Sequence, residues 1–334
     1  MTQPSSVAAP AATAAPAAFG ASWPAAPAEA VADGALWVET DADAAPLLAR
    51  WRPRPHPHPG AERCRLRVGA PGSAAGATVP PGGAPSLRMD AVRGWVDEGR
   101  GRVTLRGEAG YGVLSIVERA GWVDPCGDPG DAVPLLTIAT GVLLGAVGQL
   151  LMHAGAVVAP DGRAWLVVGD AWAGKSTTVL TLARAGWGWL SDDTVALASG
   201  APGGVVVHAW ARTPHLDVGW EDGRVTRRRA EVPLARVGPG RWQATAPLGG
   251  ILLSRVDAEA PTALAACDAP DAFAGLVRQA PWAVVSRHVA SALTLVAQRA
   301  AMHPAYTLRL GLDTYGRPER LAAVIGAAIA APGT

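Results

Sequence analysis

The stretch Gly169-Asp170-Ala171-Trp172-Ala173-Gly174-Lys175-Ser176 decides how the rest of this sequence is interpreted. It satisfies the pattern G-x-x-x-x-G-K-[ST], in which glycine-rich backbone wraps an anion and a lysine reaches the phosphates. Lys175 is also the only lysine in the chain, because every other basic residue among the 29 is arginine. An ammonium is a compact charge on a thin stem, whereas a guanidinium is broad and planar. The retained lysine therefore indicates a position that arginine cannot occupy.

The residues around this stretch predict a strand, a glycine loop, a helix and a further strand, which is the context that a phosphate-binding loop requires. Two short apolar strands at residues 154–158 and 164–168 are joined by a turn at Pro160-Asp161-Gly162. A helix over residues 176–185 follows the loop, and Gly186 ends it. Residues 194–198 then continue as a strand. The motif therefore lies between a strand and a helix, as a phosphate-binding loop does.

Two acidic residues and one histidine supply the chemistry expected beside this loop. Asp192 and Asp193 directly follow the apolar segment after the loop helix, so the fold should bring them to the loop. One carboxylate can hold Mg²⁺ together with the Ser176 hydroxyl, and the other can accept a proton from an attacking hydroxyl. His153 lies on the strand that precedes the turn at Pro160-Asp161-Gly162 and can approach the same carboxylates. A core histidine with only a structural role is the alternative for His153.

Composition narrows the class of protein. The chain of 334 residues has a net charge of +1, so no strong field points to nucleic acid or to an anionic membrane as a partner. Cys64, Cys126 and Cys267 form no C-x-x-C motif, which favours free, buried thiols in a reducing compartment such as the cytoplasm. The Ala/Pro-rich start contains no basic residue and therefore lacks the signature of a secretory signal.

The sequence divides into three segments. Residues 1–35 are predicted to be a disordered tail, and residues 36–130 a small β-rich module with strands at 93–96, 102–105 and 111–117. Residues 131–334 are predicted to be an α/β catalytic domain. Further predicted elements and surfaces are the Pro-rich extended link 52–59 with His56 and His58, the strands 204–209, 250–254 and 306–310, the helices 271–277, 289–301 and 318–330, and the solvated run Arg227-Arg228-Arg229.

One uncharged stretch, residues 133–152, is long enough to span a bilayer. Acidic residues precede it, and no cluster of basic residues flanks it as membrane orientation requires. A long helix buried on all sides and ending near Met152 is therefore the favoured interpretation, with a transmembrane helix as the alternative.

Three runs carry a resemblance to a known family. They are Leu151-Met152-His153-Ala154-Gly155-Ala156-Val157-Val158, the loop from Gly169 to Thr177, and Arg184-Ala185-Gly186-Trp187-Gly188-Trp189-Leu190-Ser191-Asp192-Asp193. Together they resemble the C-terminal domain of HPr kinase/phosphorylase, and most closely its smaller kinase-like relatives. The resemblance covers about residues 131–334. It implies a P-loop core of mixed sheet with flanking helices, related to phosphoenolpyruvate carboxykinase.

The resemblance implies an ATP- and Mg²⁺-dependent kinase whose acceptor is a serine or another hydroxyl of a peptide, a protein or a small molecule. Peptide precursors are among the acceptors it suggests, and a homo-oligomer is compatible with it. Asp192 would be the general base, His153 would tune Asp192, and Lys175 would hold the β- and γ-phosphates. Ser176 and Asp193 would bind Mg²⁺. The ATP-binding residues would be Gly169, Asp170, Ala171, Trp172, Ala173, Gly174, Lys175, Ser176 and Thr177.

The sequence also departs from the family. Ala171 and Trp172 replace a serine and a glycine of the family's loop, and the segment that follows the acidic pair in bifunctional HPr kinases is absent. These changes argue against HPr itself as the acceptor. They also leave open a nucleotide-binding regulatory module that does not catalyse, or a carboxykinase-like enzyme that uses ATP. Arg212 and Arg255 are candidates for stabilising the charge of the phosphoryl group during transfer.

Overall fold

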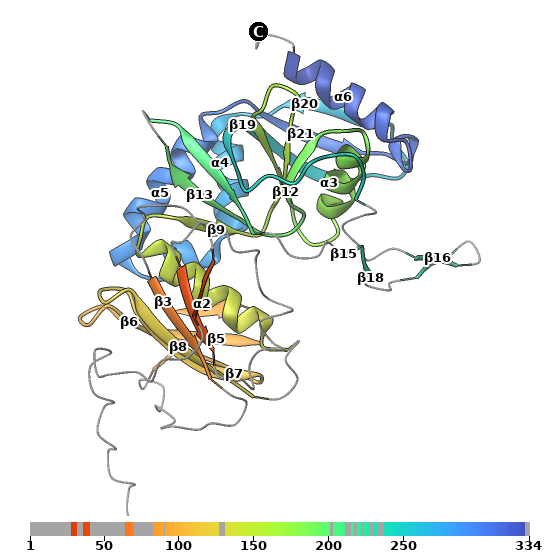
Figure 1. The fold of residues 1–334 in the computed structure, drawn as a ribbon. Helices are drawn as coiled ribbons and strands as arrows, with labels where there is room; N and C mark the ends of the chain where they lie inside the picture. Colours follow the sequence, from red (N-terminus) through yellow and green to blue (C-terminus); the bar gives the residue numbers. More distant parts are fainter. Residues whose placement is uncertain are drawn as a thin grey trace, which may run out of the picture.

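The computed structural model describes residues 28–31, 36–40, 64–69, 83–89, 91–126, 131–200, 203–210, 215–216, 219–221, 224–226, 230–232 and 237–330. Its strands form two large mixed sheets, and helices cover both faces of the second sheet (Figure 1). The α/β class with mixed sheet that the sequence predicts is therefore confirmed at this level.

The first sheet is built from the N-terminal part of the chain. Its strands are β1 (Ala28–Val31), β2 (Leu36–Thr40), β3 (Cys64–Val68), β4 (Leu87–Met89), β5 (Val92–Asp97), β6 (Arg102–Gly107), β7 (Gly110–Ser115) and β8 (Ala120–Pro125). They lie in the order β1-β2-β3-β8-β7-β6-β5-β4. Strands β5 to β8 form an antiparallel meander, whereas β2, β3 and β8 run parallel. Every second residue of β3 is buried, as one core-facing side requires.

Three of these strands are predicted from the sequence. The predictions at 93–96, 102–105 and 111–117 correspond to β5, β6 and β7 and are confirmed. Strand β1 pairs with β2, so residues 28–31 form a strand where a disordered tail was expected. The remainder of the segment 1–35 and the Pro-rich link 52–59 lie outside the described residues.

Helix α2 (Val133–Gly145) joins the first sheet to the rest of the protein (Figure 1). Its apolar residues face β7 and β8 on one side and α5 (Arg287–Ala301) on another, inside one continuous hydrophobic core. The prediction of one helix ending near Met152 is wrong, because Gly148 turns the chain at φ +74° and strand β9 (Leu150–Met152) follows. Within the described part of the chain, no helix is long and apolar enough to cross a membrane.

The second sheet has the strand order β12-β10-β11-β19-β14-β13-β9, and β21 with β20 continues from β19. Strand β19 is 12 residues long and lies parallel to both β11 and β21. The glycine turn predicted between β10 and β11 is confirmed, with Gly162 at φ +82°. These strands are β10 (Gly155–Val158), β11 (Ala164–Val168), β12 (Gly188–Ser191), β13 (Val195–Ser199), β14 (Val205–Ala209), β19 (Thr245–Val256), β20 (Ala263–Ala266) and β21 (Ala305–Leu310).

Alternate side chains of these strands enter two separate cores. Along β11, Leu166 and Val168 join the core beneath α4 (Ala269–Arg278) and α5. Trp165 and Val167 join the opposite core beneath α3 (Lys175–Arg184) and α6 (Pro318–Ala330). The helices that the sequence predicts at 176–185, 271–277, 289–301 and 318–330 correspond to α3 to α6 and are confirmed.

The remaining described elements are small. The turn segments are η3 (Pro281–Val284) and η4 (Leu312–Thr314). Two-stranded ribbons pair β15 (His215–Leu216) with β18 (Ala230–Glu231) and β16 (Gly219–Glu221) with β17 (Arg224–Thr226). Arg212 and the run Arg227-Arg228-Arg229 lie outside the described residues.

Candidate functional site

The candidate site forms around the glycine loop, residues 169–174, which connects β11 to α3. Trp172 at φ +70° and Gly174 at φ +85° both have left-handed backbone. Left-handed residues in a glycine loop can turn neighbouring N–H groups toward an anion, and here the Ala173 N–H donates to the Asp170 carbonyl oxygen at 3.2 Å. No side chain caps α3 at Gly174, so the first N–H groups of α3 are suited to receive an anion at the loop.

The two glycines of the motif are required by close packing. A Cβ atom at Gly169 would lie 2.6 Å from the Ser254 carbonyl oxygen and 2.7 Å from the Cβ of Ala173. A Cβ at Gly174 would lie 2.6 Å from Leu310, and its positive φ would strain any other residue. The loop is therefore pressed against the ends of β19 and β21.

Lys175 lies inside the loop and is only 7% exposed. Its Nζ donates hydrogen bonds to the carbonyl oxygens of Gly169, at 2.8 Å, and Asp170, at 2.9 Å. Burial lowers the pKa of the Lys175 ammonium, and the nearby carboxylates of Asp193 and Asp170 oppose that shift. The compact charge that the sequence singles out is thus held by carbonyl oxygens of the loop, within electrostatic reach of Asp193.

The acidic pair reaches the loop through a turn that Ser191 organises. The Ser191 hydroxyl donates to the carbonyl of Trp210 at 3.1 Å and accepts from the N–H groups of Asp193 and Thr194. Ser176 donates from Oγ to the Asp192 carbonyl at 3.4 Å. Asp192 is 3% exposed, so the polar environment at this turn must compensate its carboxylate. The prediction that both acids lie beside the loop agrees with this geometry.

His153 follows β9 and contacts the second acid. Its Nδ1 lies 3.3 Å from Oδ1 of Asp193, whose Oδ2 accepts a hydrogen bond from the Thr194 hydroxyl at 3.0 Å. The sequence predicts that His153 acts on Asp192, whereas the ion-pair contact in the structure is with Asp193. The reason is geometric, because Val195 pairs with Met152, so Asp193 and His153 leave neighbouring strands together.

Gln279 is a site residue that sequence reasoning missed. Its backbone carbonyl accepts a hydrogen bond from the His153 N–H at 2.9 Å. Its side-chain amide donates to Oδ1 of Asp170 in the glycine loop at 3.3 Å. One residue at the end of α4 thus connects the histidine to the loop. No local pattern marks Gln279, since its contact with Asp170 joins residues 109 positions apart.

The other predicted residues occupy the loop and its surroundings. Asp170, Ala171 and Trp172 are exposed, whereas Ala173, Ser176 and Thr177 are half-buried along the loop and the first turn of α3. Arg255 is exposed near the end of β19. The side-chain oxygens of Ser176, Asp192 and Asp193 are hard donors of the kind that Mg²⁺ prefers.

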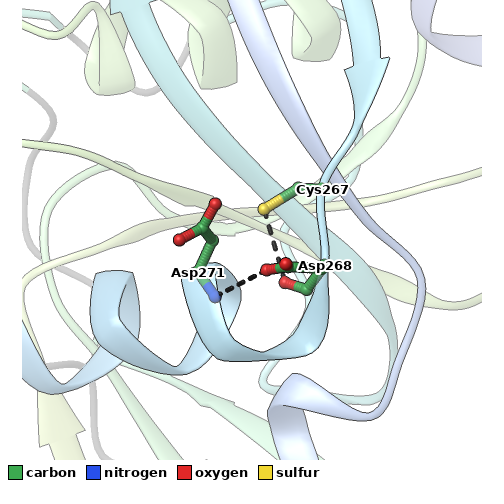
Figure 2. A group of neighbouring side chains, drawn as sticks. All are labelled: Cys267, Asp268 and Asp271. Atoms are coloured by element: carbon green, nitrogen blue, oxygen red, sulfur yellow. Dashed lines mark hydrogen bonds between the residues drawn. The ribbon is translucent and has the colours of Figure 1, made fainter.

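A second cluster of potential metal ligands lies at the start of α4, where Figure 2 shows Cys267, Asp268 and Asp271. Its geometry is that of a helix cap, because Asp268 Oδ1 accepts from the Asp271 N–H at 2.9 Å. Burial and both carboxylates raise the pKa of the Cys267 thiol, which opposes the thiolate that a metal would need. The role of Asp268 as a helix cap accounts for this cluster.

The sequence predicts that the three cysteines are buried and form no disulfide. Cys64 is buried, whereas Cys267 is only half-buried and Cys126 is exposed, so the predicted burial holds for Cys64 alone among the three.

The similarity of this chain to known proteins is weak. No protein-family model matches this chain. No curated protein matches it either. Among solved structures, the chain is similar to the Hpr(Ser) kinase/phosphatase from Coxiella burnetii, at 12% identity over 53% of this chain and 95% of that chain, with a TM-score of 0.29. This is a weak likeness at the level of the fold.

Proposed function

We propose that this protein is a Mg²⁺- and ATP-dependent phosphotransferase that phosphorylates a hydroxyl group of a peptide, a protein or a small molecule. The observation that carries the proposal is the position of Lys175, buried inside the glycine loop and beside Asp193. Phosphoryl transfer depends mainly on positioning and on stabilising charge, and a glycine loop that holds one compact cation is suited to both demands.

In this proposal the metal would be held by oxygen ligands. They would be Ser176 Oγ, which lies 3.4 Å from the Asp192 carbonyl oxygen, and the carboxylate of the next residue, Asp193, because Mg²⁺ prefers such hard donors. A bound Mg²⁺ supplies positive charge to the phosphate oxygens. His153 and Thr194 hold the Asp193 carboxylate from two sides and so orient it for this role.

The chain's own residues divide the remaining work. Lys175 balances the charge of the phosphates, with backbone N–H groups of the loop and α3 as further donors. Asp192 accepts the proton of the attacking hydroxyl as the new oxygen–phosphorus bond forms and the bond to the leaving ADP breaks. The acceptor must therefore approach from the side of Asp192.

The test uses purified full-length protein, Mg²⁺ and γ-labelled ATP, with peptides encoded by neighbouring genes as candidate acceptors. We expect label transfer or slow ATP hydrolysis, and a fall in rate of about 10²- to 10⁴-fold in Asp192→Asn, with nucleotide binding retained. Asp161→Asn, in the turn between β10 and β11, is the matched control and should behave like the wild type. Nucleotide binding with no label transfer and no hydrolysis, the same in wild type and Asp192→Asn, would refute the kinase assignment.

A second candidate function is a nucleotide-binding regulatory module without catalysis. Trp172 favours it, because a bulky residue 58% exposed stands in the loop at a backbone angle that suits glycine. The same assay separates the two functions, since a regulatory module would bind Mg²⁺-ATP and return it unchanged. A carboxykinase-like activity would instead require a carboxylic acid substrate for turnover.

A further inference from the structure

Large exposed apolar side chains are concentrated at one edge of the second sheet. Seven stand out among the described residues, and four of them lie where β11, β19 and β21 end. Trp172 is on the glycine loop itself, and Val256 is the last residue of β19. Leu312 and Tyr315 follow β21. Their exposed fractions are 58%, 54%, 55% and 49% in that order, and isolated surface apolar residues would not gather in this way.

Strand register shows that this edge has two different sides. On the β10 side of the loop, Gly155 pairs with Val167 and Ala156 with Ser191, so His153, Asp192 and Asp193 are brought to the loop from that side. We call these three residues the polar flank.

On the other side of β11, Val168 pairs with Leu253 and Val256 pairs with Leu310. The ends of β19 and β21 therefore lie beside the loop, and a Cβ at Gly174 would lie 3.2 Å from Val256. We call Val256, Leu312 and Tyr315 the apolar flank.

Side-chain contacts hold the turn that carries Leu312 and Tyr315. Asp313 Oδ1 accepts hydrogen bonds from the N–H and the hydroxyl of Thr262, each at 2.8 Å, and Arg320 pairs with Oδ2 at 2.9 Å. These contacts fix the η4 turn, in which the Tyr315 N–H donates to the Leu312 carbonyl at 3.2 Å. A fixed turn presents its apolar side chains at low entropic cost to a ligand.

A nucleotide in the loop has a direction. In the proposed function its terminal phosphate must face the polar flank, where Asp192 receives the proton. The rest of the molecule then extends away from that flank, past Gly174 and toward the ends of β19 and β21. A purine is a flat, largely apolar group that gains from stacking on aromatic and aliphatic surfaces.

We propose that Val256, Leu312 and Tyr315 form the subsite that receives the base of the nucleotide. This inference rests on the proposed function, because it needs a nucleotide whose phosphates occupy the loop. The base would then bind against the apolar flank on one side of the loop. The acceptor would approach the polar flank on the other side.

The experiment compares two ligands that share phosphates and differ in the base. Binding of Mg²⁺-ATP and of Mg²⁺-tripolyphosphate is measured by calorimetry on the full chain. We expect Tyr315→Ser and Val256→Ser to weaken ATP binding by about tenfold, as loss of a stacking contact does, and to leave tripolyphosphate binding unchanged. Tyr315→Phe keeps the ring and should bind ATP as the wild type does.

Met302→Ser is the matched control. Met302 is 79% exposed and precedes β21, at the opposite end of the strand from Leu312, so neither ligand should sense its change. Equal weakening of both ligands, or no weakening of ATP, in the Tyr315 and Val256 variants overturns the subsite and leaves the proposed function standing. A wild-type chain that binds neither ligand overturns the proposed function itself.

Discussion

The polar flank and the apolar flank meet the same glycine loop and are built in different ways. The polar flank depends on contacts between polar and charged side chains of separate elements, such as His153 with Asp193 and Gln279 with Asp170. The apolar flank combines the end of β19 with the turn after β21, and that turn is fixed mainly by the contact of Asp313 with Thr262. Precise placement of charge requires a network of several elements, whereas an apolar surface needs only a fixed backbone. The difference suggests which substitutions should change catalysis and which should change binding.

Among changes to the loop and its supports, Lys175→Arg should have the largest effect, because Lys175 lies inside the loop that both flanks border. The lysine is 7% exposed and bonded to two loop carbonyls, so a broad guanidinium has no room although the charge is kept. We expect kcat/KM to fall by about 10³-fold, measured as ATP turnover. Arg184→Lys, at the end of the same helix, makes the opposite exchange outside the site and should leave turnover unchanged. Normal turnover in Lys175→Arg would contradict the central role of the lysine.

Gln279→Leu should test the network behind the polar flank. The change removes the amide that holds Asp170 and keeps the backbone carbonyl that binds the His153 N–H. We expect kcat to fall by about tenfold, as for other residues that orient a site indirectly. The KM for ATP should rise less, because the loop backbone still binds the phosphates.

Gln149→Leu is the control for this prediction, since Gln149 and Gln279 are both 9% exposed. It changes a buried amide in a segment that leads into β9, before the site begins. A similar loss of kcat in both variants would mean that Gln279 acts through general stability and does not position the site.

Trp172→Gly should make the folded protein more stable. A tryptophan at φ +70° is held in strained backbone, and glycine relieves that strain, so the free energy of unfolding should increase by about 1 kcal/mol. Arg119→Gly is the comparison, because Arg119 has φ +55° in the turn between β7 and β8. Trp172→Gly and Arg119→Gly should both unfold at a higher denaturant concentration than the wild type, and only Trp172→Gly should also change nucleotide binding. A destabilised Trp172→Gly would show that the ring packs favourably where it is.

The smallest expected effect is a dependence of stability on pH. The pKa of Lys175 is lowered below its ordinary value of 10.5, so the folded chain disfavours the charged form relative to the unfolded chain. Between the two pKa values the unfolded chain binds more protons, and stability therefore rises with pH through that window. The difference in unfolding free energy between wild type and Lys175→Met, followed from pH 7 upward, should change in this direction. A difference that falls as pH rises would contradict the lowered pKa.

The part of the fold around the glycine loop could be predicted because its signals are local. The apolar run 164–168, the glycine turn at Gly162 and the helix ending at Gly186 each occur within a few residues. The N-terminal sheet was harder, since β2 pairs in parallel with β3 and β3 with β8, across long stretches of chain. The second acid was expected to bind metal, but its contact with His153 depends on which strand ends lie together, and spacing in sequence does not contain that information.

Helix α2 has a consequence for how the protein unfolds and how it can be divided. Its side chains belong to the same apolar core as Leu114 of the first sheet and Val289 of α5, so neither half can lose its structure without uncovering the other. Thermal unfolding should therefore be a single cooperative transition. A fragment that begins at residue 131 would expose the surface that normally covers β7 and β8, and it should associate with itself in solution.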